Sequence, residues 1–338
     1  MKLSNNFNVG IIGTGVGYFH FKTLEKLISC KKIKVYDINK KNYLKLKKSK
    51  KVIFVENEDE IFKDSTIELV IIASYDNCHF DQIIKSFKSK KFVFCEKPIC
   101  QTKKELTIIR KYLKKDKDLF ISSNFVLRNH PTFRELEKKI KKNELGKVFH
   151  IHGEYNYGRI EKIINGWRGR IPFYSVMQGG GIHLIDLALF LKKELPIEVF
   201  AMSNNTTTKK TSFKFADFIK ATFKYKDGCV FSVTANFGCV MPHNHKFSIY
   251  GTKKTFEYDF NKSKIFKSRN KKNSPTLLKK NFLNKDKSYL LLNFVDFLKK
   301  RSNQIISSKE IFESMTLCFS VHESLKKKKL VKIFYNNE

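Results

Sequence analysis

The sequence has no long apolar run. No stretch approaches the ~20 consecutive apolar residues that a membrane-spanning helix needs. The first seven residues, Met1 to Phe7, lack the apolar centre of a secretory signal peptide. We therefore expect a soluble, cytoplasmic protein that does not bind a membrane.

Cysteines are few and show no pairing pattern. There are seven, an odd number, with neither the paired spacing of a metal site nor a disulfide framework. They stand at positions 30, 78, 95, 100, 229, 239 and 318. We interpret them as reduced thiols without a chemical role, and we expect no metal site.

Acidic residues are also few. The chain has 32 Asp and Glu against 67 Lys and Arg, a formal net charge of +35. A basic face is typical of nucleic-acid binding. Here, however, lysine greatly outnumbers arginine and is spread along the chain, as at 45–51, 111–117 and 326–329. This distribution favours a bias in base composition over a dedicated nucleic-acid function, and it suits the attraction of anionic small molecules.

The start of the chain resembles a nucleotide-binding unit. A short apolar run at 7–12 leads into Gly13-Thr14-Gly15-Val16-Gly17, after which apolar residues recur at helical spacing. This order predicts a buried strand, a glycine turn and a helix whose N-terminus can hold a phosphate. The match to G-x-G-x-x-G is imperfect, because Tyr18 stands where the third glycine belongs. We interpret residues 13 to 17 as cofactor-binding.

A carboxylate follows the second predicted strand. Residues 33–36 end in Asp37, about 20 residues past the glycines. A carboxylate there can accept hydrogen bonds from the adenosine ribose and would repel a 2′-phosphate, so NAD is favoured over NADP. The alternative is a helix-capping or turn aspartate before residues 38–40.

Further strands alternate with helices. Apolar runs at 68–74 and 92–95 predict a doubly wound parallel sheet. The loops after these strands lie at the carboxyl edge, where such sheets bind ligands. We therefore expect Ser74, His79, Glu96 and Lys97 to line one crevice. A last strand at 120–125 places the domain boundary after residue 125.

Several short motifs occur in an order that resembles the Gfo/Idh/MocA oxidoreductases. They are Asp-Asn-Cys-His at 76–79, Cys-Glu-Lys-Pro at 95–98, Asn124 with Arg-Asn-His-Pro at 128–131, Leu-Gly-Lys-Val at 145–148, and the glycine-histidine cluster at 179–186. The resemblance implies a Rossmann domain at 1–125 that binds the cofactor, with Asn124 in contact with it. It also implies a C-terminal α/β domain at 126–338, with an open, largely antiparallel sheet that covers the substrate.

The same resemblance implies a reaction. Family members oxidise or reduce a hydroxyl or keto group of a sugar, cyclitol or nucleotide sugar with NAD(P). The C-terminal sheet often mediates assembly, so we expect a homo-oligomer, either a dimer or a tetramer.

Hydride transfer needs a base for the hydroxyl proton and positive charge near the oxygen. Lys97 can supply the charge and His183 can take the proton near neutral pH. Asp186 lies one helical turn after His183, where it could orient the ring or bind a substrate hydroxyl. One departure from the family is Gly179, since an aspartate commonly stands four residues before the histidine. A non-catalytic NAD- or ligand-sensing protein on the same fold is therefore the alternative.

Other polar residues suit a substrate between the two domains. The only tryptophan, Trp167, lies in a Gly-Trp-Arg-Gly loop, which favours contact with cofactor or substrate over core packing. Arg128 and Arg168 suit an anionic substrate, because guanidinium groups bind carboxylate or phosphate with paired hydrogen bonds. The expected substrate contacts are Lys97, Arg128, Tyr157, Trp167, Arg168 and His183, and Trp167 and Arg168 are also expected at the cofactor.

In the C-terminal half, apolar and polar residues alternate as they do in half-exposed antiparallel strands. His150 and His152 fall on one face of a predicted strand, but we interpret them as sheet-facing residues because nothing at useful spacing completes a metal site. Residues 261–288, rich in lysine and asparagine, are expected to form a solvated loop.

Overall fold

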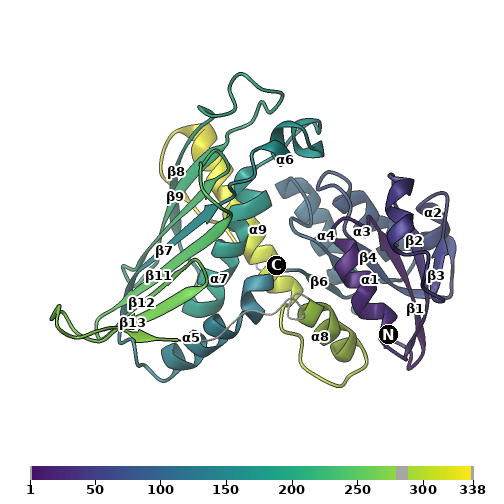
Figure 1. Ribbon diagram of the computed structural model, residues 1–338, viewed down its shortest axis with the longest axis horizontal. Helices are drawn as coiled ribbons and strands as arrows, with labels where there is room; N and C mark the ends of the chain where they lie inside the picture. Colours follow the sequence, from purple (N-terminus) through teal and green to yellow (C-terminus); the bar gives the residue numbers. More distant parts are fainter. Residues whose placement is uncertain (1, 279–287, 336–338) are drawn as a thin grey trace. The chain divides into compact units, whose positions relative to one another are not determined.

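Two structural units make up the chain in the computed structural model, which describes residues 2–278 and 288–335 (Figure 1). The first comprises Met1–Phe125 with Lys285–Phe312, and the second comprises Val126–Asn284 with Glu313–Glu338. Within the described ranges, no helix is long and apolar enough to cross a membrane.

The first unit contains a six-stranded sheet with strand order β3-β2-β1-β4-β5-β6. Every pair of neighbouring strands is parallel, and the order reverses between β1 and β4. The predicted doubly wound sheet is confirmed. Its strands are β1 (Phe7–Ile12), β2 (Cys30–Tyr36), β3 (Val52–Phe54), β4 (Ile67–Ile72), β5 (Phe92–Cys95) and β6 (Ile121–Ser123). Its helices and turns are α1 (Gly17–Glu25), η1 (Lys40–Lys45), α2 (Asp59–Lys63), α3 (His79–Lys88), α4 (Lys103–Lys115) and α8 (Tyr289–Leu298).

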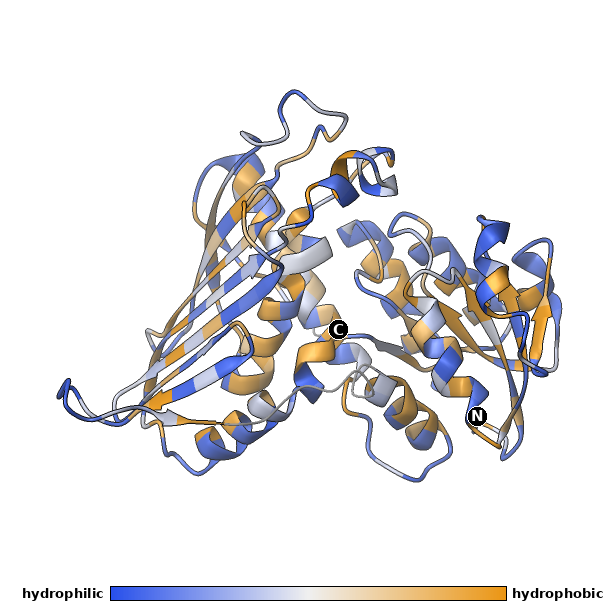
Figure 2. Cartoon of the chain, viewed as in Figure 1, coloured by the Kyte–Doolittle hydropathy of each residue, from blue (hydrophilic) through white to orange (hydrophobic). Residues whose placement is uncertain are grey.

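The central strands of this sheet are buried. Parallel strands covered on both faces have continuous apolar sequences, and residues 69–72 of β4 are all 0% exposed. Figure 2 colours these strands as hydrophobic. Helix α8 adds to this core from far along the chain, because Phe294 packs on Phe94 with ring centroids 6.1 Å apart. Helix α8 therefore packs with the first unit, although it lies within the range 126–338 expected for the second domain.

The second unit contains a nine-stranded sheet with strand order β14-β13-β12-β11-β7-β10-β9-β8-β15. Its pairs are antiparallel except for β7 with β10, which run parallel. The strands are β7 (Val148–Asn156), β8 (Glu198–Asn204), β9 (Phe218–Lys224), β10 (Val230–Asn236), β11 (Asn244–Gly251), β12 (Thr255–Asp259), β13 (Lys262–Phe266), β14 (Thr276–Leu277) and β15 (Val331–Lys332). The largely antiparallel sheet expected from the family resemblance is confirmed.

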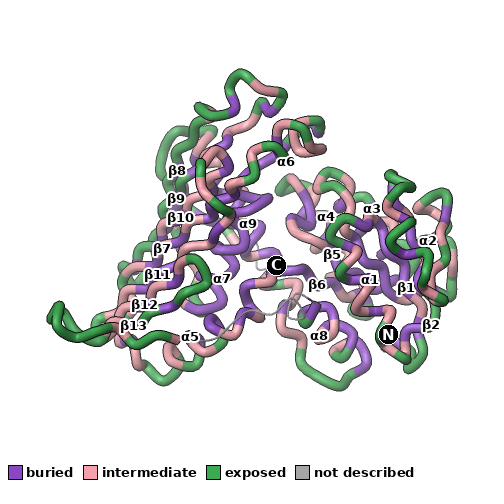
Figure 3. Tube along the Cα trace, viewed as in Figure 1, coloured by how far each residue is buried: buried purple, intermediate pink, exposed green. Residues whose placement is uncertain are grey.

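One face of this sheet is covered and the other is not. Buried residues alternate with exposed ones along β9 and mostly with half-buried ones along β10 (Figure 3). Helix α7 (Ile182–Lys192) packs closely on β7, because a Cβ at Gly153 would lie 3.2 Å from Leu184. The other helices and turns are η2 (Val126–Asn129), α5 (Pro131–Lys141), α6 (Glu161–Ile164), η3 (Trp167–Gly169), the π-helical η4 (Met177–Gly181) and α9 (Ser308–Lys327), which continues from the first unit.

The structure tests two expectations for the C-terminal half, the loop at 261–288 and the pair His150 and His152. The expected loop at 261–288 contains β13 and β14, so it is wrong for those strands, and residues 279–287 lie outside the described ranges. His152 accompanies His150 on the half-exposed face, where its ring contacts Ser232 at 2.8 Å and Glu154 at 2.8 Å. Nowhere in the described residues do three or more His, Cys, Asp or Glu side chains gather in a group that could hold a metal ion.

Candidate active site

The glycine turn lies between β1 and α1 in the first unit. Gly13 has a φ of +85°, and a Cβ there would lie 2.5 Å from the Ala73 carbonyl oxygen, so only glycine fits. A Cβ at Gly15 would meet nothing within 4 Å, so the turn leaves open space. Gly17 lets α1 approach the sheet, with a built Cβ 3.3 Å from both Ala73 and Ile11. Gly17 therefore performs the close-packing role of the third glycine, one position early.

Asp37 holds this turn from the end of β2. Its carboxylate accepts hydrogen bonds from the Thr14 backbone N–H at 2.6 Å and from the Thr14 hydroxyl. It also accepts from the Asn39 N–H at 2.7 Å and from Asn42 Nδ2 at 3.1 Å. The structure thus brings Asp37 to the glycine turn, as a dinucleotide site requires, while the contact with Asn39 is the turn-forming alternative. This geometry is compatible with both roles.

The loops after β4 and β5 are joined at the carboxyl edge of the sheet. The buried His79 ring contacts the Pro98 carbonyl oxygen at 2.7 Å and the Ser74 carbonyl oxygen at 3.2 Å. The Ser74 hydroxyl donates to Gln82 at 2.6 Å. His79 therefore bridges the two loops through their backbones, and it positions the loop that carries Lys97, which is half-buried.

Glu96 is the centre of a buried polar cluster in the same unit. Its Oε1 contacts His20 Nε2 at 2.9 Å and accepts a hydrogen bond from Asn124 Nδ2 at 2.7 Å. Burial opposes ionisation of this carboxyl most strongly, but the hydrogen bonds from His20 and Asn124 and the charges of His20 and Lys97 outweigh it, so the pKa of Glu96 lies below its ordinary value. The buried His20 Nδ1 and Asn124 Oδ1 have no hydrogen-bond partner among the described residues. These two atoms, with the open space at Gly15, fit a polar ligand such as a dinucleotide.

His183 lies near the start of α7 in the second unit, within a cluster of rings. Tyr155 from β7 stacks on it with centroids 6.2 Å apart, and His245 from β11 lies 6.2 Å away at 88°. His243 adds a third imidazole, 5.0 Å from His245 and 5.3 Å from Tyr155. The sequence reasoning missed His243 and His245. The sequence feature that could have identified them is His243-Asn244-His245, at the start of β11, which is hydrogen-bonded to β7.

Tyr157, Trp167 and Arg168 belong to the same neighbourhood. Tyr155 and Tyr157 stack at 6.3 Å, and the Arg168 guanidinium lies 5.9 Å from the Tyr157 ring and 4.5 Å from the Trp167 ring. The Arg159 guanidinium also lies over the Tyr157 ring, 4.5 Å from its centroid. Burial raises the pKa of Tyr155, although Arg159 and Arg168 act in the opposite direction. Tyr155 is therefore a neutral wall of the cluster at physiological pH, flanked by two guanidinium groups.

Arg128 and Asp186 pair with each other instead. Arg128 Nε donates to Asp186 Oδ2 at 2.8 Å and Nη2 donates to Oδ1 at 2.7 Å, with side chains 1% and 0% exposed. The Ser314 hydroxyl donates to Oδ1 at 3.2 Å. The structure commits this guanidinium to a buried carboxylate, which leaves no surface for the anionic substrate expected at Arg128. Asp186 therefore joins η2 and α9 to α7.

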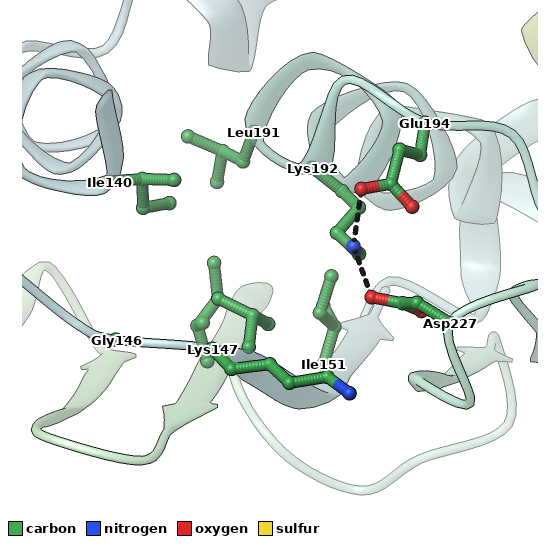
Figure 4. A pocket seen from close by; sticks show the side chains of 10 residues that line it. Ile140, Gly146, Lys147, Ile151, Leu191, Lys192, Glu194 and Asp227 are labelled. Atoms are coloured by element: carbon green, nitrogen blue, oxygen red, sulfur yellow. Dashed lines mark hydrogen bonds and ion pairs between the residues drawn. The ribbon is translucent and has the colours of Figure 1, made fainter. Parts of the chain in front are cut away.

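A cavity of about 280 Å³ lies elsewhere in the second unit (Figure 4). It is lined at the start of β7 and the end of α7, where Lys192 Nζ donates to Glu194 and Asp227 at 2.8 Å each. Tyr155 and His183 lie toward the opposite ends of these elements. At ~3.3 Å per strand residue, Tyr155 is roughly 23 Å along β7 from Val148 and roughly 13 Å from Ile151, which also lines the cavity. The ammonium group of Lys192 is paired within the fold, so we take the ring cluster rather than this cavity as the candidate site.

Comparison with known proteins agrees with this arrangement. Residues 7–124 match a family model described as an oxidoreductase family with an NAD-binding Rossmann fold, and residues 133–257 match the GFO/IDH/MocA C-terminal domain. Glucose-6-phosphate 3-dehydrogenase of Bacillus subtilis is 28% identical over 77% of this chain and 76% of its own length. Myo-inositol 2-dehydrogenase of Thermotoga maritima is 22% identical over 72% and 73%. A levoglucosan dehydrogenase structure with NADH superposes with a TM-score of 0.84 at 18% identity, covering 97% of this chain and 99% of that one.

Proposed function

This chain belongs to the Gfo/Idh/MocA family of NAD(P)-dependent oxidoreductases, and we propose that it transfers a hydride between NAD(H) and a hydroxyl or keto group of a sugar, cyclitol or nucleotide sugar. The observation that carries the proposal is the cluster of His183 with Tyr155, Tyr157 and Arg168, which combines a titratable imidazole, aromatic walls and positive charge. Aromatic and polar groups of this kind suit a sugar ring with a reacting hydroxyl.

The first unit would hold the cofactor. The glycine turn offers backbone N–H groups to its pyrophosphate, and Asp37 would exchange the Thr14 hydroxyl for a ribose hydroxyl. Asn124 Oδ1 and His20 Nδ1 would meet polar groups at the other end of the dinucleotide. The bound nicotinamide supplies the hydride chemistry. We favour NAD over NADP because the carboxylate of Asp37 would repel a 2′-phosphate.

In this proposal two protein side chains serve the substrate oxygen. Lys97 donates a hydrogen bond to it and stabilises the negative charge that develops there, while the His183 imidazole takes its proton during oxidation and returns it during reduction. Arg159 and Arg168 replace Arg128 as the expected ligands of an anionic group, since they border the ring cluster. One relative is named for a phosphorylated sugar, glucose 6-phosphate, which agrees with that charge.

The test is a screen of sugars, inositols, uronic acids, sugar phosphates and nucleotide sugars as substrates. The absorbance of NADH measures turnover of each compound. With a substrate in hand, Lys97→Ala should lower turnover by ~10²-fold, the scale for loss of one electrostatic donor. Affinity for NADH should stay close to that of the unmodified protein. Lys103→Ala, an exposed lysine at the start of α4, is the matched control and should change neither. If the protein binds NADH but turns over no member of the screen, the non-catalytic ligand-sensing alternative is favoured.

We also propose a homo-oligomer, a dimer or tetramer, in the cytoplasm. The uncovered face of the nine-stranded sheet supports assembly, because it carries the exposed apolar side chains of Phe200 and Met202 on β8. The seven free cysteine thiols support a cytoplasmic location, because the cytoplasm keeps thiols reduced. Light scattering across a concentration series measures the assembly state, and a monomer at every concentration would exclude it.

A further inference from the structure

The glycine triplet before α7 makes room for aromatic side chains. A Cβ at Gly179 would lie 2.1 Å from the Tyr174 hydroxyl oxygen and 2.7 Å from its ring, distances that real Cβ atoms do not show. A Cβ at Gly180 would lie 2.5 Å from the Tyr155 ring. The space in which a side chain at 179 would project is therefore filled by the Tyr174 hydroxyl.

Tyr174 is held firmly in this place. It is 3% exposed, and its ring packs edge-on against Trp167, Phe213 and Phe237 at 5.9, 5.8 and 6.2 Å. Arg168 Nε donates a hydrogen bond to the hydroxyl oxygen at 3.1 Å. Because the ring is packed and the oxygen is bonded, the hydroxyl has a defined position with a guanidinium group behind it.

The backbone between Tyr174 and Gly179 is fixed as well. The Ser175 hydroxyl accepts a hydrogen bond from the Gln178 N–H at 3.2 Å and contacts His322 Nε2 on α9 at 2.6 Å. The Gly179 N–H donates to the Ser175 carbonyl oxygen at 2.8 Å. Gly179 precedes His183 by four residues, but the segment through Gly181 is π-helical, so packing rather than α-helical spacing links Tyr174 to His183. The Phe237 ring lies 6.2 Å from Tyr174 and 5.7 Å from Tyr155, and Tyr155 stacks on His183 at 6.2 Å. Tyr174 thus borders the ring cluster that surrounds the candidate base.

We propose that Tyr174 is a substrate-contacting catalytic residue whose hydroxyl donates a hydrogen bond to a negatively charged oxygen beside the carbon served by His183. A carboxylate at position 179 would repel such an oxygen, whereas a phenol backed by Arg168 attracts it. The substrate class is therefore an anionic sugar, a phosphorylated sugar or a uronic acid. This inference rests on the proposed function, because it assigns a residue and a substrate class to the same site.

The experiment compares Tyr174→Phe with the unmodified protein, using glucose against glucose 6-phosphate and against glucuronate, and the matched pair for any substrate that the screen finds. Calorimetry with NADH present measures binding, and NADH absorbance measures turnover. Tyr174→Phe should weaken binding of the anionic partner, and lower its kcat/KM, by about 10- to 100-fold, as expected for a hydrogen bond to a charged group. The neutral partner should change less than threefold, and NADH affinity should not change. Tyr258→Phe is the control, since it removes a buried hydroxyl of the same unit that contacts His130 at 3.2 Å and donates to Asn261 at 2.8 Å.

Gly179→Ala gives an independent second variant, because the methyl group must displace the Tyr174 hydroxyl. It should reproduce the loss for the anionic partner, and the double variant should lose no more than either single variant. Equal losses for neutral and anionic partners, or a folded Tyr174→Phe protein with unchanged binding and turnover, would overturn the proposal, as would an unmodified protein that binds no anionic sugar. Selective binding of anionic sugars without turnover would leave Tyr174 in place and refute the proposed function alone.

Discussion

The ion pair of Arg128 and Asp186 makes a quantitative prediction about the second unit. Both side chains are almost fully buried, and two charge-assisted hydrogen bonds of 2.8 and 2.7 Å join them. Replacing Asp186 by Ala leaves the guanidinium in the core without its counter-charge. Breaking a buried pair in this way costs about 3–5 kcal/mol of unfolding free energy, whereas replacing both partners by apolar residues of similar size is often neutral. Asp186→Ala should therefore be strongly destabilised, and Arg128→Met with Asp186→Leu should recover most of the loss.

Urea unfolding followed by tryptophan fluorescence measures this effect, because the single tryptophan, Trp167, lies in the second unit. Lys192→Ala is a comparison from the same unit, since its ion pairs with Glu194 and Asp227 are more exposed and should contribute about 1 kcal/mol or less. An Asp186→Ala protein within ~1 kcal/mol of the unmodified protein, but without turnover, would refute the structural role and restore Asp186 to the chemistry.

Three further outcomes follow from the structure. Asp37→Ala should weaken NAD binding and narrow the preference over NADP, measured by fluorescence titration, and equal affinities in the unmodified protein would show that the carboxylate serves only the glycine turn. His183→Asn should slow turnover and remove a pH dependence near neutrality, and an unchanged pH profile would remove His183 from proton transfer. Burial lowers the pKa of His322 from 6.5 to about 4, so the unfolded chain binds the proton first and the unfolding free energy falls as the pH decreases from 6.5 to 4. At ~1.4 kcal/mol per pH unit the loss of unfolding free energy is at most about 3.5 kcal/mol, and His322→Gln should flatten this part of the stability profile in urea titrations at stepped pH.

The parallel sheet could be predicted because its physics is local. A strand covered on both faces must be apolar throughout, so 68–74 and 92–95 are evident as strands without knowledge of their partners. Gly13 could be predicted in the same way, since its positive φ and its contact with Ala73 belong to one turn between a strand and a helix. The carboxyl edge then follows from the topology.

The polar partners could not be predicted, because they come from distant parts of the chain. His20 meets Glu96 across 76 residues, and Arg128 meets Asp186 across 58. A sequence identifies groups that need a partner but not which one they find. From the sequence alone Arg128 suits an anionic substrate, whereas in the structure its partner is Asp186 on α7. Likewise, α8 follows the second domain in sequence, whereas its Phe294 packs on Phe94 of the first unit.

The lysine excess also has a structural component that composition alone conceals. Lys91 is 2% exposed, and its Nζ donates to the carbonyl oxygens of Asp64 and Ile67 at 2.6 and 2.8 Å. Lys51 donates to the carbonyl oxygens of Glu25 and Leu27 at the end of α1, at 2.8 and 2.6 Å. An ammonium group at these positions donates to carbonyl groups at the ends of helices and strands, where the negative end of the peptide dipoles favours a cation. Lysines used in this way are committed to the backbone, whereas a lysine that binds nucleic-acid phosphate must reach solvent. Part of the +35 net charge therefore comes from lysines, such as Lys51 and Lys91, that donate hydrogen bonds to backbone carbonyl groups within the fold.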